Sequence, residues 1–204
     1  MLQAAMDLAD EQGIDAVTMR TLAKHLGIEA ASLYNHVRGK DDLLDAMTEL
    51  AIGEIETPAE GTPWKEAMRR RAISAREVFT RHKWASSLID SRNRTGPVSI
   101  GYVDRVLGIL IGAGYSPAQA AVAFVVVDGY IYGFERQRVS IGTDGDDEAT
   151  EAAQEILEAI PDGGFPNAMK VAAEFAATPF DTDAAFEFGL GLILDGLERQ
   201  LGSE

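Results

Sequence analysis

Cysteine is absent from the 204-residue chain, and histidine occurs only three times. The lack of cysteine excludes disulfide frameworks, thiolate zinc sites, iron–sulfur clusters and cysteine nucleophiles. It is compatible with a reducing compartment, and we expect a cytoplasmic protein. The sequence also lacks the His-Glu-x-x-His, Gly-x-Ser-x-Gly and phosphate-loop motifs, so no enzyme is predicted. No basic segment precedes an apolar core at the start of the chain, so no signal peptide is predicted.

Basic side chains are scarce as well. Lys and Arg number 18 against 33 Asp and Glu, which gives a formal net charge of −15. Non-specific binding to polyanions comes from Lys and Arg on phosphates, so a histone-like protein is excluded. The charge is unevenly distributed, however. Between Thr18 and Lys40 four basic residues accompany a single acidic one, Glu29, so specific contact with DNA remains possible.

One long stretch, Val106 to Val127, contains no charged residue and has the length of a membrane span. Glycine and proline lie in its middle, between Gly112 and Pro117. These residues end one helix and begin another, so each half is too short to cross a bilayer. We therefore expect two buried helices and no membrane partner.

Apolar residues recur at helical spacing along the chain, and no run alternates long enough to indicate a sheet. The sequence predicts an all-α protein. A three-helix domain with a helix-turn-helix (residues 1–50) is joined to a larger helical domain (residues 51–204), with a candidate linker at 57–63 and a loop at 142–148. The predicted helices cover residues 2–12, 19–26, 30–37, 40–54, 64–82, 84–90, 97–112, 117–138, 150–160, 167–175 and 183–201.

The segment from Thr18 to Val37 has the form of a helix-turn-helix, with Gly27 in the turn. Leu33 and Val37 are expected to face inward, which leaves the other side chains of the second helix for solvent or DNA. Such a helix lies in the major groove, where alanine methyls can meet thymine methyls and an asparagine can bond a base edge. The geometry alone leaves two interpretations open, because any three-helix bundle contains a similar turn.

Three segments, Thr18–Ile28, Ser32–Val37 and Lys40–Ala46, resemble the DNA-binding domain of TetR-family transcriptional regulators. Weaker similarity to the C-terminal domain of the tetracycline-repressor branch is carried by Gly114–Pro117, Tyr130–Phe134 and Phe186–Glu198. The resemblance implies a ligand-responsive regulator, most simply a repressor. Such a protein binds a palindromic operator in double-stranded DNA as a homodimer and is released by a small-molecule effector.

The resemblance also assigns DNA-binding roles. Phosphate contacts fall on Thr18, Tyr34, His36 and Lys40, and base-reading or base-proximal positions fall on Arg20, Ala30, Ala31, Ser32 and Asn35. Tetracycline repressors carry Gln-Pro and Trp at the positions of the two alanines and Asn35, so a different operator is expected. The family usually has a short basic arm before its first helix, whereas Met1 stands almost at the start of the predicted helix.

Two helices of the larger domain are apolar on nearly all sides, which is typical of helices buried on two faces. They form either an internal core pair or a four-helix interface between two subunits. We favour the dimer interface, and the resemblance implies the same. Its predicted residues are Val122, Val126, Gly129 and Gly133 on one helix and Phe186, Gly189, Leu190, Ile193 and Leu197 on the other.

The middle helices carry aromatic and polar residues that are expected to line an effector cavity, because such cavities are mostly apolar with a few polar anchors. Asp128 is the only charged residue between Arg105 and Glu135, and a buried carboxylate needs a partner. It either anchors a ligand or forms a hydrogen bond in the dimer interface, which we favour. His82 is either a ligand contact or, preferably, a helix-end cap. The predicted lining comprises Phe79, His82, Trp84, Leu88, Ile89, Tyr102, Val106, Phe124, Asp128 and Tyr132.

The resemblance also bears on the identity of the effector. Tetracycline repressors hold a drug–magnesium chelate with a histidine whose position here is Ile89, and a partner-subunit acid falls near Gln137. The departure at Ile89 argues against tetracycline, and no metal or cofactor is predicted. The alternative function is a helical ligand-binding or interaction protein whose DNA-binding unit is vestigial. An intact Tyr34 and Lys40 argue against that alternative.

Overall fold

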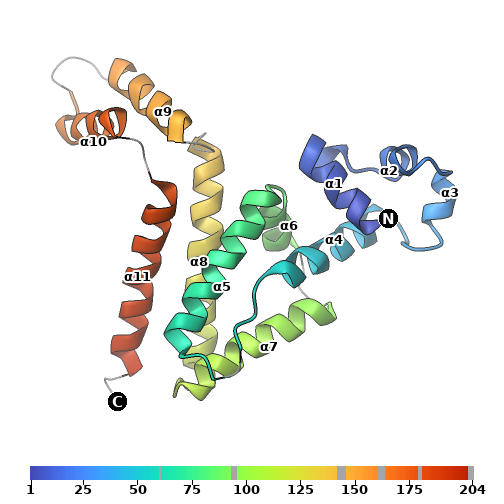
Figure 1. Cartoon of the computed structure of the whole chain (residues 1–204), viewed down its shortest axis with the longest axis horizontal. Helices are drawn as coiled ribbons and strands as arrows, with labels where there is room; N and C mark the ends of the chain where they lie inside the picture. Colours follow the sequence, from blue (N-terminus) through green and yellow to red (C-terminus); the bar gives the residue numbers. More distant parts are fainter. Residues whose placement is uncertain (60, 93–95, 142–145, 160–163, 179–180, 202–204) are drawn as a thin grey trace.

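The computed structural model describes residues 1–59, 61–92, 96–141, 146–159, 164–178 and 181–201. Helices make up most of these ranges, which contain no strand. The amino-terminal helices form a small unit on one side, and the longer helices form a second, larger body (Figure 1). The all-α prediction with a small and a large helical part is confirmed.

The small unit begins with α1 (Leu2–Gln12), a 3-10 turn (Ile14–Ala16) and α2 (Met19–Leu26), followed by α3 (Ala30–Leu33). The first two helices have the predicted bounds. The second helix of the motif is shorter than the predicted 30–37, because residues 34–36 form a turn. The N–H groups of His36 and Val37 both bond the carbonyl of Leu33, at 2.9 and 3.1 Å. The turn formed by these two hydrogen bonds follows the end of the helix at Leu33, and Val37 after it is buried in the core.

Helix α4 (Lys40–Glu54) connects the two parts of the molecule. Its amino-terminal half packs against α1, and its carboxyl-terminal half packs against α5, α6 and α7 (Figure 1). Buried Leu43 and Met47 belong to the small unit's core, and buried Ala51 and Ile52 continue along the same helix. The chain therefore passes the expected boundary at residue 50 without interruption.

The larger body contains α5 (Trp64–Arg81), α6 (Ala85–Ser91), α7 (Pro97–Gly112), α8 (Pro117–Ile141) and α11 (Thr182–Leu201). Helix α8 packs against all four of the others. Helices α9 (Asp146–Ala159) and α10 (Pro166–Ala177) pack mainly on each other and stand away from the bundle (Figure 1). Of the loop predicted at 142–148, residues 142–145 lie outside the described residues and 146–148 belong to α9.

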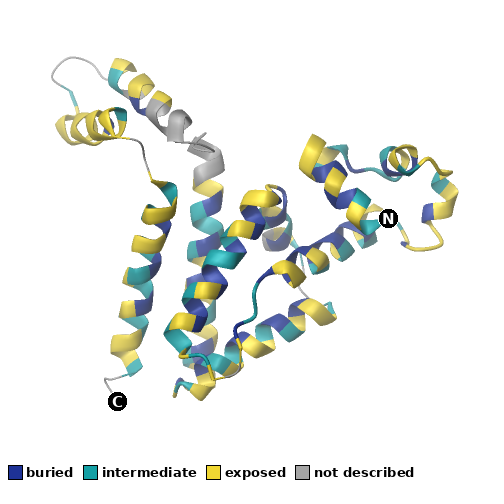
Figure 2. Ribbon diagram, viewed as in Figure 1, coloured by how far each residue is buried: buried dark blue, intermediate teal, exposed yellow. Residues whose placement is uncertain are grey.

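The buried side chains follow the inner faces of these helices (Figure 2). One continuous core runs from Met6 and Leu22 in the small unit to Phe79, Val106 and Leu190 in the larger body. The two parts therefore share an apolar interior. Helix α10, by contrast, is almost entirely exposed (Figure 2).

The long uncharged segment is divided between α7 and α8, as the glycines and proline in its middle predicted. Helix α8 from Pro117 to Gln137 is nevertheless long and apolar enough to cross a membrane by length and composition. Its acidic residues Asp128 and Glu135 are buried and pair with Arg71 and Arg76 of α5. In the single chain Val122 and its neighbours on α8 are exposed, on the face that was predicted to meet a second subunit.

Candidate functional site

The helix-turn-helix is fixed at both ends of α2 by local hydrogen bonds. Thr18 is the N-cap, as predicted: its hydroxyl accepts the Thr21 N–H at 3.1 Å, while the Thr21 hydroxyl accepts the Thr18 N–H at 2.9 Å. At the other end Gly27 adopts the left-handed conformation, with φ of 68°, which glycine reaches without steric cost. Leu22 and Leu33 are buried beneath the turn.

The outer surface of this motif presents the predicted DNA-binding residues. Tyr34 is 56% exposed, and Thr18 and Ala30 are half-buried. The exposed ones are Arg20, Ala31, Ser32, Tyr34, Asn35, His36 and Lys40. They come from α2, α3, the turn after α3 and the first residue of α4. Seven of the nine predicted residues are thus accessible, and one of them, His36, also lines a cavity beside α1 and α4.

Two basic side chains on this surface have no acidic partner among the described residues. Arg20 and Lys40 form no ion pair with a described residue. Arg38 does, because its guanidinium lies 3.1 Å from the Asp42 carboxylate. A hydrogen bond from the Arg38 backbone N–H, and a second from its side chain, hold the pKa of Asp42 below its usual value. Asp42 thereby stabilises the first turn of α4.

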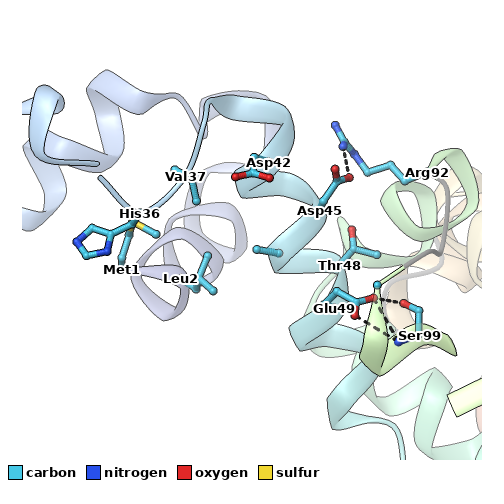
Figure 3. A pocket seen from close by; sticks show the side chains of 12 residues that line it. Met1, Leu2, His36, Val37, Asp42, Asp45, Thr48, Glu49, Arg92 and Ser99 are labelled. Atoms are coloured by element: carbon cyan, nitrogen blue, oxygen red, sulfur yellow. Dashed lines mark hydrogen bonds and ion pairs between the residues drawn. The ribbon is translucent and has the colours of Figure 1, made fainter. Parts of the chain in front are cut away.

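Glu49 on α4 caps the amino terminus of α7. Its carboxylate accepts the backbone N–H of Val98 at 2.8 Å and that of Ser99 at 3.3 Å, and it also binds the Ser99 hydroxyl (Figure 3). A carboxylate at this position satisfies free N–H groups and favours the positive end of the helix dipole. The small unit is therefore anchored to the larger body at the start of α7.

A second anchor lies one turn along α4. Arg92, between α6 and α7, binds Asp41 at 2.9 Å and also Asp45. Beside these pairs is a cavity of about 340 Å³ at the junction of the two parts, which Leu2, His36 and Glu49 help to line (Figure 3). Arg92 therefore pairs with two aspartates of α4 at the junction of the two parts, beside the Glu49 cap.

His82 connects the two parts at the carboxyl-terminal end of α4. It is the C-cap of α5, as predicted, and is only 4% exposed. One ring nitrogen lies 2.9 Å from both carboxylate oxygens of Asp10 on α1, and the other lies 3.3 Å from Glu54 on α4. The Trp84 indole N–H also donates to Asp10, at 2.7 Å. His82 and Trp84 therefore contact the small unit, in addition to lying beside the predicted cavity.

A buried arginine lies among the residues that were predicted to line the effector cavity. Arg71 on α5 is fully buried, binds Asp128 and donates to the Tyr102 hydroxyl at 2.5 Å. Its guanidinium lies between the rings of Tyr102 and Phe124, 5.3 and 5.2 Å from their centroids. Burial opposes the charged form, but Tyr102 and Asp128 raise the pKa of Arg71, so it remains protonated.

Arg71 was not among the predicted site residues, although the sequence contained a signal for it. Helix α5 has an apolar face that includes Met68, Ala72, Ala75 and Phe79, and position 71 falls inside that face. A charged residue there requires a buried partner, and Asp128 is that partner. Asp128 accordingly bonds within its own subunit, where an interface hydrogen bond had been favoured.

The other predicted cavity residues surround this cluster. Phe79 and Tyr132 lie with ring centroids 5.3 Å apart. Ile89 and Val106 are buried, and Leu88 is half-buried. Among the described residues, no group of three or more His, Asp or Glu side chains is placed to hold a metal ion.

The predicted dimer residues separate into two sets. Phe186 and Leu190 are buried within the subunit, where the Phe186 ring stacks on Tyr130 at 5.3 Å. Gly189 allows this packing, since a Cβ there would collide with the Tyr130 hydroxyl. Of the rest, Ile193, Leu197 and Gly133 are half-buried and Gly129 is exposed. The exposed apolar face of α8 and α11 consists of Val122, Val125, Val126, Phe188 and Leu192.

The fold and both parts of the chain match known proteins. Residues 1–47 match the model for bacterial regulatory proteins of the tetR family, and residues 57–201 match the tetracyclin repressor-like C-terminal domain. The HTH-type transcriptional repressor DrrR1 of Streptomyces coeruleorubidus is 30% identical over 97% of this chain and 76% of its own. The class A tetracycline repressor from transposon 1721 of Escherichia coli is also 30% identical, over 98% of this chain and 89% of its own.

Solved structures agree with the sequence matches. ActR from Streptomyces coelicolor, in complex with actinorhodin, has a TM-score of 0.81 at 27% identity over 99% of this chain and 96% of its own. A TetR variant from Acinetobacter baumannii AYE, in complex with minocycline, has a TM-score of 0.75 at 25% identity over 99% and 93%. The chain belongs to the TetR family of bacterial transcriptional regulators.

Proposed function

We propose that this protein is a homodimeric repressor that binds operator DNA through the α2–α3 surface and releases it when an effector enters the larger domain. The observation that carries the proposal is the accessible surface of Arg20, Tyr34, Asn35 and Lys40 on an intact helix-turn-helix. Phosphate contacts from Tyr34 and Lys40 would position the motif. Asn35 and the alanines before it would read base edges in the major groove.

The exposed apolar face of α8 and α11 supports assembly as a dimer. Val122, Val125 and Phe188 are exposed in the single chain, with Phe188 71% accessible. Large apolar side chains exposed on two neighbouring helices are suited to an interface with another subunit. A two-fold pair of subunits would present two recognition surfaces, and such symmetry matches a palindromic operator with two half-sites.

The cluster around Arg71 supports an effector site in the same place as the predicted cavity. Aromatic rings of Phe79, Phe124 and Tyr132 would cover the faces of a planar ligand, while Arg71 and Tyr102 would bind its oxygen atoms. Related proteins have been solved with actinorhodin and with minocycline. We infer an aromatic, oxygen-rich effector for this protein, held by rearrangement of the Arg71–Asp128 pair.

Contacts between the two parts supply a route from effector to DNA. Tyr102 belongs to the Arg71 cluster and lies one helical turn from Ser99, which the Glu49 carboxylate holds. Displacement of Tyr102 by a ligand would shift α7 and, through Glu49, would tilt α4. The recognition surfaces of two subunits would then no longer match successive major grooves. Linkage requires that operator DNA weaken effector binding by the same factor.

Mobility-shift assays test this function. Labelled fragments that cover the DNA flanking the gene are incubated with nanomolar protein and excess non-specific competitor. A fragment that is retarded selectively supports the proposal. If no fragment of the flanking DNA is bound selectively at low salt, the proposed operator-binding role is wrong.

The second candidate is a ligand-binding protein with a vestigial DNA-binding unit. Even residues 1–50 are acidic overall, with nine Asp and Glu against four Lys and Arg, which weakens non-specific DNA binding. Lys40→Ala separates the two candidates. If Lys40→Ala changes neither DNA binding nor ligand binding, the vestigial unit is favoured. If the substitution abolishes DNA binding, the repressor is favoured.

A further inference from the structure

A groove of about 690 Å³ lies between the chain that follows α4 and one flank of α7. The described part of its first wall includes Pro58, Thr62, Pro63 and Trp64, which precede or begin α5. The groove is distinct from the cavity at the α4–α7 seam and from the Arg71 cluster, neither of which shares its lining residues. Its volume is in the range of small-molecule sites.

Helix α7 has two different faces. Tyr102, Val106 and Leu110 are buried and face the interior. The groove is lined by the flank beside this buried stripe, which carries Arg105, Gly108, Ile109, Gly112 and Ala113. These positions recur at the three- and four-residue spacing of one side of a helix. A ligand in the groove would therefore lie against one flank of the helix whose buried side carries Tyr102 of the proposed effector site.

The groove is mainly apolar and has a fixed aromatic side chain at one end. The Trp64 ring meets the Tyr115 ring edge-on, with centroids 5.5 Å apart and an interplanar angle of 85°. Tyr115 itself is buried, so it supports the indole from behind. Gly108 lies in the floor, and a Cβ added there would meet no atom within 4 Å. The space above this helix face is therefore open to a ligand.

Arg105 is the only charged residue among the described lining residues. The five arginines of α5 each bind a carboxylate, as Arg69 does with Glu187 and Arg81 with Glu54. Arg105 differs from them, since it has no hydrogen bond or ion pair with any described residue. In a chain with 33 acidic residues, a cation without a carboxylate at the mouth of an apolar groove is suited to an external anion.

We propose that this groove is a second small-molecule site, which takes a compound with an apolar, preferably aromatic, body and one anionic group. The body lies against Trp64 and the Gly108–Gly112 surface of α7, and the Arg105 guanidinium binds the carboxylate or sulfonate. Arginine suits this role because its planar donors match a carboxylate or sulfonate oxygen pair.

Titration with 8-anilinonaphthalene-1-sulfonate tests the site, because this fluorescent probe combines an aromatic body with one sulfonate. Gly108→Leu places a side chain in the groove and is expected to weaken binding at least tenfold. Arg105→Gln is expected to weaken it roughly three- to tenfold through loss of a charge-assisted bond, while Arg105→Lys retains most of the affinity.

Gly108→Ala is the matched control. Its methyl group meets no neighbouring atom, and alanine favours the helix, so probe affinity should equal that of the wild type. Any probe bound near the Arg71 cluster contributes equally to all four variants, so its signal cancels when their affinities are compared. Unchanged affinity in Gly108→Leu, or an equal loss in Gly108→Ala, would overturn the assignment. Both outcomes are independent of DNA binding, so they leave the proposed repressor function untouched.

Discussion

The Glu49 carboxylate on α4 caps α7 at the N–H groups of Val98 and Ser99, 2.8 and 3.3 Å away. An N-cap normally comes from the residue that precedes its helix. Here it comes from the helix that carries the DNA-binding unit, so the orientation of that unit depends on the start of α7.

Glu49→Ala is expected to lower the free energy of unfolding by about 1–2 kcal/mol, the usual cost of losing a helix cap. It should also weaken operator binding several-fold, because α4 loses its anchor. Ser99→Ala is the graded control, since it removes the hydroxyl contact and leaves both backbone bonds. Chemical denaturation and fluorescence anisotropy measure the two effects. Equal DNA affinity in the wild type and Glu49→Ala would show that this cap does not orient the DNA-binding unit.

His82→Ala tests the anchor on the other side of α4. The substitution removes hydrogen bonds to Asp10 on α1 and Glu54 on α4, and a typical hydrogen bond contributes about 0.5–1.5 kcal/mol of net stability. Hydrogen exchange should accelerate in α1 while the α5–α8 core stays protected. If exchange rises equally in both parts, His82 stabilises the whole fold and does not specifically join its two units.

Lys40→Ala is expected to weaken operator binding about uniformly across DNA sequences and to reduce the slope of log K against log salt by about 1, because one phosphate contact is lost. Lys170→Ala is the control, since Lys170 is exposed on α10. Salt-dependent anisotropy titrations measure both slopes. An unchanged slope for Lys40→Ala would remove Lys40 from the phosphate-binding set.

Asp128→Asn leaves Arg71 charged and buried without its carboxylate. Loss of one partner of a buried ion pair typically costs about 3–5 kcal/mol, so the midpoint of thermal unfolding should fall strongly. Replacing both residues with apolar ones, as in Arg71→Met with Asp128→Leu, should recover much of that loss. A single substitution that costs less than the double one would contradict a coupled pair.

The sequence predicted most of the fold because its breaks carry strong local signals. Thr18, Gly27 and the Gly112–Pro117 segment each end or begin a helix by their own chemistry, and the structure follows them. Helical periodicity correctly placed Leu33 inward and Ala31 and Ser32 outward, whereas the predicted DNA-contact roles came from the resemblance. The resemblance to TetR regulators was confirmed by the family matches to both parts of the chain.

Contacts between distant helices could not be predicted to the same extent. Nothing local indicates that Asp10 would meet His82, or that Glu49 would cap α7, because both contacts depend on how α4 crosses the larger body. Arg71 was overlooked for a related reason. A run of three arginines at 69–71 is typical of a solvated face, and only the apolar neighbours at 68, 72 and 75 reveal that the third points inward.

In the proposed repressor two subunits read two half-sites of one operator. Titration of a labelled operator, selected from random duplexes, measures both the stoichiometry and the contribution of each half-site. We predict two chains per duplex, a palindromic site, and at least a hundredfold loss of affinity when one half-site is scrambled. Binding by a single chain, or equal affinity for the intact and the scrambled site, would show that the two half-sites are not read together.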